Sequence, residues 1–134
     1  MKITIRPAKI GDIESIRLLI ETYAKQQRLY PRSEAEIRRF IRSFFVAQAG
    51  RRIVGCVALE VYSPKISEVR SLAVEGQWAG KDIGSRLVEA CLKRAKRRGI
   101  AEVMAITSSE HFFEKQGFSF ALPHEKKALF YWTK

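Results

Sequence analysis

The chain has 134 residues, of which 46% are hydrophobic and 29% are charged, and its net charge is +11. This length is that of one domain with a core of its own, and the composition is ordinary for a globular protein. No apolar run approaches the roughly 18 residues of a membrane span, which argues against a membrane protein. The positive charge favours an anionic partner (nucleic acid, a phosphorylated cofactor or an acidic metabolite), although many basic proteins have none.

The first third of the chain predicts one strand and two helices. Residues 3–8, ITIRPA, alternate apolar and polar as a short strand does. The stretch 11–27 predicts a helix with Asp12 as its N-cap or first-turn acid. Its apolar face carries Ile13, Ile16, Leu19, Ile20 and Tyr23. Pro31 interrupts this pattern, and Ser33 then opens a second short helix over 34–43.

Three strands and a long helix follow. Residues 44–49 and 51–62 predict a hairpin around Gly50, and 67–75 alternates as a third antiparallel strand. The next helix begins near Ile83, and its apolar residues have the spacing of a strongly amphipathic helix. They are Gly84, Leu87, Val88, Cys91, Leu92 and Ala95. The cations that precede Gly99 fit the negative end of this helix better than they fit a nucleic-acid contact.

The last third of the chain predicts a crossover to a parallel strand. Residues 101–107 form a strand directly after the long helix, so this strand is expected to run parallel to 67–75. A short helix over 108–117 follows, and 118–123 and 127–134 are expected to add two last strands. The fold class is therefore α/β (α+β), with residues 1–134 forming a single domain around a mixed sheet.

Neither cysteine points to a metal or a disulfide. Cys56 and Cys91 lack the spacing of a zinc site and lie in apolar surroundings, which predicts two buried thiols and no metal. The N-terminus MKITIRPAKI lacks the apolar segment of a secretory signal, so we expect a cytoplasmic location.

The loop 76–87, GQWAGKDIGSRL, joins a strand to a helix. Backbone N–H groups at a helix N-terminus attract anions, and Gly80 and Gly84 permit close approach of a ligand. Two glycines four residues apart are weak evidence for phosphate binding by themselves. The loop is neither a Walker A motif nor a GxGxxG fingerprint.

In its context the loop resembles a known family. The segments SEVRSLAV, GQWAGKDIGSRL and FFEKQGF are similar to the strand, turn and C-terminal motifs of GNAT acetyltransferases. The pieces LYPRS and IVGCVALEVY add a resemblance to the amino-acid acetyltransferase subgroup, the N-acetylglutamate synthases of arginine biosynthesis. The similarity extends over nearly the whole chain. It implies a GNAT fold with a sheet of about six to seven strands and about four helices.

The resemblance implies acetyl-CoA as the donor. Its pyrophosphate would lie on the turn 79–85 and its pantetheine arm along the strand before it, with the Val74 N–H facing the thioester oxygen. The implied cofactor-binding residues are Leu72, Ala73, Val74, Ala79, Gly80, Lys81, Asp82, Ile83, Gly84, Ser85 and Phe113.

Two positions in the turn depart from the family pattern R-G-x-G-x-G/A. Ala79 replaces the leading Arg or Gln, and Asp82 replaces the middle glycine. Asp tolerates left-handed backbone angles, so we expect the turn to survive. Its carboxylate would repel a pyrophosphate, or would cap the following helix and compete for its N–H groups. Lys81 and Arg86 would partly offset that charge.

The resemblance also assigns the catalytic groups. Glu68 matches the acidic residue of the subgroup and would accept the proton of an amine; the alternative is a surface carboxylate paired with Lys or Arg. The tyrosine that protonates the leaving thiolate in many relatives is Phe113 here. Ser108 and Ser109 are the nearby hydroxyl candidates, and helix capping is their alternative role.

For the acceptor, Arg32 and Arg70 match positions that bind substrate carboxylates in the subgroup, and a guanidinium suits that task. The leading hypothesis is therefore acetyl transfer to the amine of a small amino acid, glutamate for preference, by direct attack. Three alternatives stay open: a protein N-terminus or lysine as acceptor, a GNAT-like module that has lost catalysis, and, least favoured, a nucleic-acid binder. The sequence leaves the oligomeric state open, with a homodimer as one option.

Overall fold

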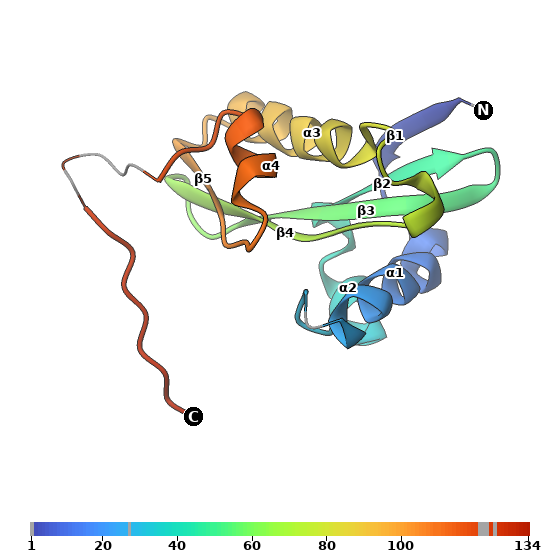
Figure 1. Ribbon diagram of the computed structural model, residues 1–134, viewed down its shortest axis with the longest axis horizontal. Coiled ribbons are helices and arrows are strands. Elements are labelled where there is room, and N and C mark those ends of the chain that lie inside the picture. Colours follow the sequence, from blue (N-terminus) through green and yellow to red (C-terminus); the bar gives the residue numbers. More distant parts are fainter. Residues whose placement is uncertain (1, 27, 121–123, 125) are drawn as a thin grey trace.

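The computed structural model describes residues 2–26, 28–120, 124 and 126–134. Its centre is a five-stranded mixed sheet in the order β1-β2-β3-β4-β5, in which only β4 and β5 run parallel (Figure 1). The strands are β1 (Ile3–Pro7), β2 (Phe44–Ala49), β3 (Arg52–Val61), β4 (Ile66–Val74) and β5 (Glu102–Ala105). The predicted hairpin and the predicted parallel crossover are confirmed.

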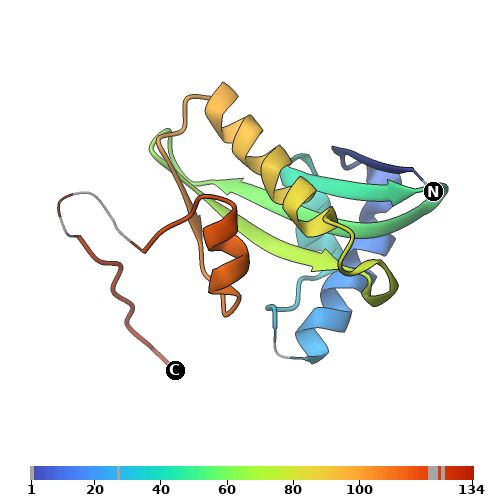
Figure 2. The same ribbon diagram turned by 45° about the horizontal axis from the view of Figure 1, so that its top comes forward.

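Helices cover both faces of the sheet (Figures 1 and 2). They are α1 (Ile13–Lys25), α2 (Glu34–Arg39), α3 (Ile83–Arg97) and α4 (Glu110–Lys115). The helices α1 and α2 lie on one face, and α3 and α4 lie on the other. The second helix is shorter than predicted, because a 3-10 turn (Ile41–Ser43) follows it.

The strands alternate their side chains between two apolar cores. In β2, Phe44 and Val46 face α1, whereas Phe45 and Ala47 face α3. The strand β3 is buried on both faces over Val54–Glu60, which explains its nearly continuous apolar sequence. The predicted apolar faces of α1 and α3 are the faces that pack on the sheet.

Gly55 allows α3 to approach the sheet closely. A Cβ atom at this position would lie 3.1 Å from Leu87 Cδ1, 3.2 Å from Ile83 Cγ2 and 3.3 Å from the Ala73 carbonyl oxygen. All three contacts are tighter than ordinary van der Waals packing, so the glycine sets the depth at which the first turn of α3 sits on β3.

A β-bulge in β4 separates this strand from β5. Cys56 pairs with Ala73 and Ala58 with Arg70, so two residues of β4, Ser71 and Leu72, oppose one residue of β3. Ser71 has a φ of 58°, in the left-handed region. The pairing of β4 with β5 ends just before the bulge, and the two strands then diverge.

Asp12 occupies the N-cap position of α1, as predicted, but its side chain supports this region through other bonds. Its side chain makes no cap hydrogen bond to α1; it accepts from the Lys9 N–H at 2.8 Å and pairs with Arg6 at 2.8 Å. Burial works to raise the pKa of Asp12, but these hydrogen bonds outweigh it and lower the pKa below its usual value.

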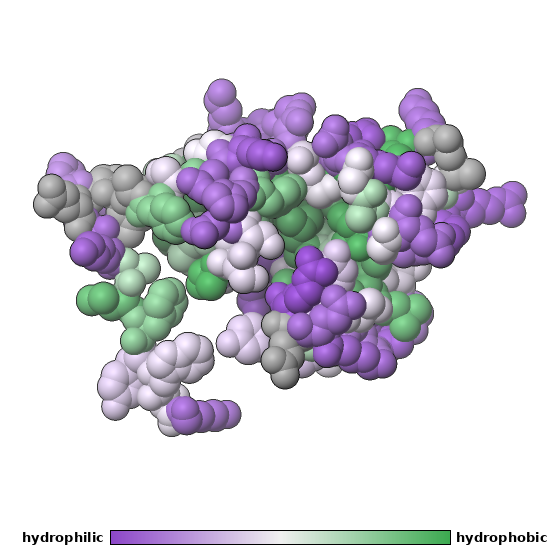
Figure 3. Space-filling model, in the orientation of Figure 1, coloured by the Kyte–Doolittle hydropathy of each residue, from purple (hydrophilic) through white to green (hydrophobic). Residues whose placement is uncertain are grey.

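The sheet has five strands rather than the expected six or seven. Residues 118–120 and 126–134 form no strand, and 121–123 lie outside the described residues. Residues 126–134 extend away from the domain, and they expose the side chains of Leu129, Phe130, Tyr131 and Trp132 (Figure 3). Phe118 packs on the core through Phe113, but residues 118–120 and 126–134 pair with no strand of the described chain, and a strand forms only against a partner.

Candidate active site

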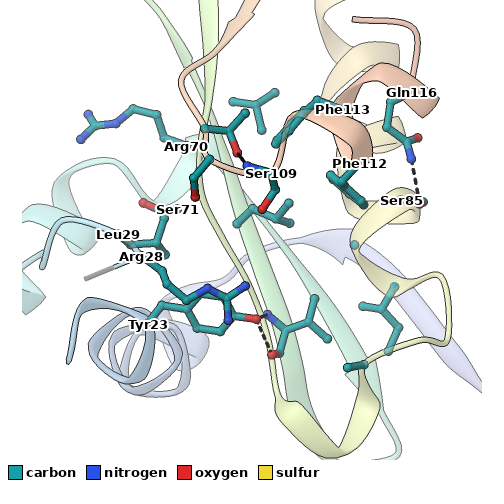
Figure 4. A pocket seen from close by; sticks show the side chains of 18 of the residues that line it. Tyr23, Arg28, Leu29, Arg70, Ser71, Ser85, Ser109, Phe112, Phe113 and Gln116 are labelled. Carbon is teal, nitrogen blue, oxygen red and sulfur yellow. Dashed lines mark hydrogen bonds between the residues drawn. The ribbon is translucent and has the colours of Figure 1, made fainter. Parts of the chain in front are cut away.

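A groove of about 1270 Å³ opens where β4 and β5 diverge. One wall comes from the end of α1 and the segment after it, and the other from α4 and the first turn of α3 (Figure 4). The divergence leaves the β5-facing edge of β4 without a strand partner beyond Val69. A bare strand edge presents N–H and C=O groups to any extended ligand that enters.

Tyr23 of α1 occupies part of this edge. Its hydroxyl donates to the Val74 carbonyl at 2.8 Å and accepts from the Val74 N–H at 3.1 Å (Figure 4). The Val74 N–H therefore has a partner other than the expected thioester oxygen. Because backbone direction alternates along a strand, Leu72 presents its groups to the same side, and it also lines the groove. The Ala73 side chain is buried on the other face and does not reach the groove.

The turn before α3 keeps the backbone conformation that the resemblance implied. Gly80 has a φ of 78° and Asp82 a φ of 61°, so Asp82 takes the left-handed conformation of the glycine that it replaces. Its side chain makes no cap hydrogen bond, which removes the predicted competition for the helix N–H groups. Asp82 lines the groove, whereas Lys81 points outside it.

The other residues of the turn lie on the groove wall. Ala79, Gly80, Ile83, Gly84 and Ser85 all line it. Ser85 accepts a hydrogen bond from the Gln116 amide at 2.8 Å, which ties the segment after α4 to the first turn of α3 (Figure 4). The turn and α4 therefore form one continuous wall.

Glu68 lies at the groove and is nearly buried. Its carboxylate accepts a hydrogen bond of 2.5 Å from the Tyr62 hydroxyl. Burial and this hydrogen bond raise the pKa of Tyr62 to about 12, so the phenol keeps its proton over the physiological range. The predicted alternative for Glu68, a surface carboxylate paired with Lys or Arg, does not describe this arrangement.

The two serines and Phe113 lie on the opposite wall. Ser108 and Ser109 are exposed to the groove, and Ser109 occupies the N-cap position of α4 without a side-chain cap bond. Their hydroxyls are thus not used for capping. Phe113 packs edge-to-face on Phe112 and Phe118, with ring centroids 5.0 and 5.2 Å apart.

The two arginines predicted to bind a carboxylate differ in access. Arg70 lines the groove and pairs with Glu60 at 2.8 Å. The Arg32 side chain is only 1% exposed and does not line the groove. It pairs with Glu60 at 2.6 Å and Glu36 at 2.7 Å and donates to the Ser71 hydroxyl. Direct contact between Arg32 and a substrate carboxylate would require these bonds to break.

Sequence reasoning missed four residues around the groove: Tyr23, Glu60, Tyr62 and Gln116. The alternation of the predicted strand 51–62 could have placed Glu60 and Tyr62 on one face of the sheet, with Glu60 opposite Glu68 of the next strand. Nothing in the sequence connects Tyr23 with Val74 or Gln116 with Ser85, because these contacts depend on how helices pack.

Both cysteines are free and buried, as predicted. Burial raises the pKa of Cys56 and of Cys91 to about 12, so neither thiol supplies a nucleophile at neutral pH. Within the described ranges no three His, Cys, Asp or Glu side chains gather as a metal site. No helix in the described part of the chain is long and apolar enough to cross a bilayer.

Comparison with known proteins agrees with this geometry. Residues 41–120, well over half of the chain, match the model of the acetyltransferase (GNAT) domain. The chain belongs to the GNAT acetyltransferase family. The predicted GNAT fold is therefore confirmed.

This GNAT chain spans different shares of its relatives' lengths. An uncharacterized N-acetyltransferase of Chlorobaculum tepidum is 35% identical over 85% of this chain and 74% of its own length. The amino-acid acetyltransferase of Pasteurella multocida is 32% identical over 92% of this chain, which spans only 30% of that relative.

Two solved structures share the fold closely. N-acetylglutamate synthase from Neisseria gonorrhoeae, complexed with coenzyme A and N-acetyl-glutamate, has a TM-score of 0.85 at 28% identity, over 92% of this chain and 31% of that one. The Mycobacterium tuberculosis protein Rv2747, in a complex that contains CoA, has a TM-score of 0.84 at 28% identity, over 89% of this chain and 73% of that one.

Proposed function

We propose that this GNAT domain transfers the acetyl group of acetyl-CoA to the amino group of a small amino acid, with glutamate as the preferred acceptor. The observation that carries the proposal is the pair Glu68 and Arg70. Two residues apart on β4, a carboxylate and a guanidinium line the same groove, beside the bare strand edge. The two groups can bind the amine and the carboxylate of one amino acid.

The groove fits a CoA thioester. An extended pantetheine arm matches the edge of β4 at Leu72, and an anionic pyrophosphate matches the turn 79–85 at the N-terminus of a fifteen-residue helix. Relatives in complexes with coenzyme A have the same fold. Leu72 then replaces Val74 as the N–H donor nearest the thioester, since Tyr23 holds Val74.

In the proposed reaction Glu68 accepts a proton from the acceptor ammonium, directly or through a water molecule. The free amine attacks the thioester carbonyl, the C–N bond forms and the C–S bond breaks. Ser108 or Ser109 passes a proton to the departing thiolate, and its hydroxyl regains the proton that the nitrogen loses as the amide forms. Both buried cysteines stay outside this path, so the transfer is direct, without an acyl-enzyme.

A release assay for free thiol, run over the standard amino acids with acetyl-CoA, tests this function. We expect the fastest release with glutamate and a loss of turnover in Glu68→Gln without a matching loss of CoA affinity. Equal loss of turnover and of CoA affinity would remove Glu68 as the base. Release with peptides but with no free amino acid would favour a protein acceptor instead.

The pathway, the location and the assembly of the protein are also proposals. We propose a role in arginine biosynthesis, which the names of the amino-acid acetyltransferase relatives support, together with a cytoplasmic location and a homodimer as one option for the assembly. A second candidate function is a CoA-binding module without catalysis. Ala79, Asp82 and the replacement of a tyrosine by Phe113 favour it. Binding of acetyl-CoA without thiol release for any acceptor would support it.

A further inference from the structure

Two residues, Glu60 of β3 and Tyr62 just after the end of that strand, contact the pair on β4. Glu60 of β3 is the cross-strand partner of Glu68, and Tyr62 lies two residues further along the same face. Glu60 holds Arg70 by an ion pair of 2.8 Å, and Tyr62 donates to Glu68 at 2.5 Å. Each group on the groove is thus held by one residue that neither the family resemblance nor the comparisons assign.

The cross-strand carboxylates would repel each other without this arrangement. Like charges directly opposite in an antiparallel pair are destabilising. Here both glutamates are buried, with a relative residue exposure of 9% each, which strengthens the repulsion between their carboxylates. Two guanidinium groups on Glu60 and one phenol on Glu68 compensate for it. Although burial works against its charge, Arg70 and Arg32 keep the pKa of Glu60 below its usual value.

Glu60 needs both of its oxygens for this role. Oε1 accepts from Arg32 at 2.6 Å and Oε2 from Arg70 at 2.8 Å. A glutamine in its place would offer one acceptor and turn an NH₂ group toward the other guanidinium, so it could hold only one of them. Arg32 also binds Glu36 and Ser71, whereas Glu60 is the one ion-pair partner of Arg70 among the described residues, so we expect Arg70 to lose its hold.

We infer that Glu60 and Tyr62 are positioning residues for the acceptor: Glu60 fixes the Arg70 guanidinium for the acceptor carboxylate, and Tyr62 fixes the Glu68 carboxylate for the amine. This inference rests on the proposed function. It predicts that Glu60 affects the KM for the acceptor and that Tyr62 affects kcat. Loss of Glu60 weakens acceptor binding, and loss of Tyr62 slows proton removal.

The test compares Glu60→Gln, Tyr62→Phe and a matched control, Glu36→Gln, in the thiol-release assay. Glu36 also pairs with Arg32 but does not touch Arg70. In Glu60→Gln we expect the KM for the acceptor to rise about tenfold or more while the KM for acetyl-CoA stays unchanged. In Tyr62→Phe we expect kcat to fall about tenfold at an unchanged acceptor KM. Glu36→Gln should leave all three constants unchanged.

Three outcomes would overturn the inference: equal effects of Glu60→Gln and Glu36→Gln, parallel changes in the KM values of both substrates in Glu60→Gln, or wild-type kinetics in both Glu60→Gln and Tyr62→Phe. Tyr62 is 53% exposed, so we expect Tyr62→Phe to fold. If Glu60→Gln does not fold, the kinetics of Tyr62→Phe still test the role of Tyr62.

A second measurement separates this inference from the acceptor proposal. If the wild type acetylates no amino acid, the proposed function fails, and the rotation of the Arg70 guanidinium can still be measured by nitrogen-15 NMR. We expect slow rotation in the wild type and in Glu36→Gln, and fast rotation in Glu60→Gln. Equally fast rotation in the wild type would show that Glu60 does not hold Arg70.

Discussion

Asp82 places a negative charge in the turn where the proposed pyrophosphate binds. Its φ of 61° shows that it takes the glycine conformation, and its carboxylate makes no cap hydrogen bond. At about 6 Å and an effective dielectric constant of about 20 to 80, two unit charges repel by about 1 to 3 kcal/mol. Replacement by glycine or asparagine removes this repulsion. We therefore expect CoA to bind about 5- to 100-fold more tightly to Asp82→Gly.

Asp82→Asn is the matched variant, because asparagine keeps the side-chain shape and the tolerance of left-handed angles while it removes the charge. Isothermal titration with CoA should show most of the gain in CoA affinity in both variants. Added salt should reduce the difference in affinity between each variant and the wild type. The stability of the free protein should change little, since glycine relieves strain but also loosens the unfolded chain. Weaker CoA binding by Asp82→Asn would refute the reasoning and show that the carboxylate supports the turn.

Three further substitutions test the fold around the groove. Gly55→Ala places a Cβ against α3 and should lower the free energy of unfolding by about 1 to 3 kcal/mol in a urea titration, whereas Gly11→Ala, which meets no atom within 4 Å, should not. Tyr23→Phe removes the hydroxyl bridge to Val74 and should cost about 1 kcal/mol by the same titration; no change would show that water replaces it. Asp12→Asn should destabilise the protein at pH 7. Because the pKa of Asp12 is lowered on folding, the difference should disappear as the pH falls below that pKa, and a constant difference would contradict it.

The periodic elements of the fold could be predicted from sequence because their pattern follows from burial on one face. The helix α3 shows this clearly: its apolar spacing and the cations before Gly99 both agree with the structure. The crossover to β5 followed from the order strand, helix, strand. The last strands were wrongly expected, since apolar alternation does not say whether a partner strand is present.

The site could be predicted only where a motif resembles a family. The turn around Asp82 and the positions of Glu68 and Arg70 at the groove agree with that resemblance. The bond between Tyr23 and Val74 joins residues 51 positions apart, and no local pattern encodes it. The burial of Arg32 was missed for a similar reason: Arg32 lies before α2, and its partner Glu60 lies 28 residues away on β3.

The location of CoA on the chain tests the central claim most directly. Titration of the nitrogen-15-labelled protein with CoA should shift the backbone amide signals of Leu72, Gly80, Gly84 and Ser109, which all line the groove. The basic C-terminal end of α3, around Arg97, is the competing anion site and should not respond. Shifts confined to that end, with none at the groove, would contradict the account.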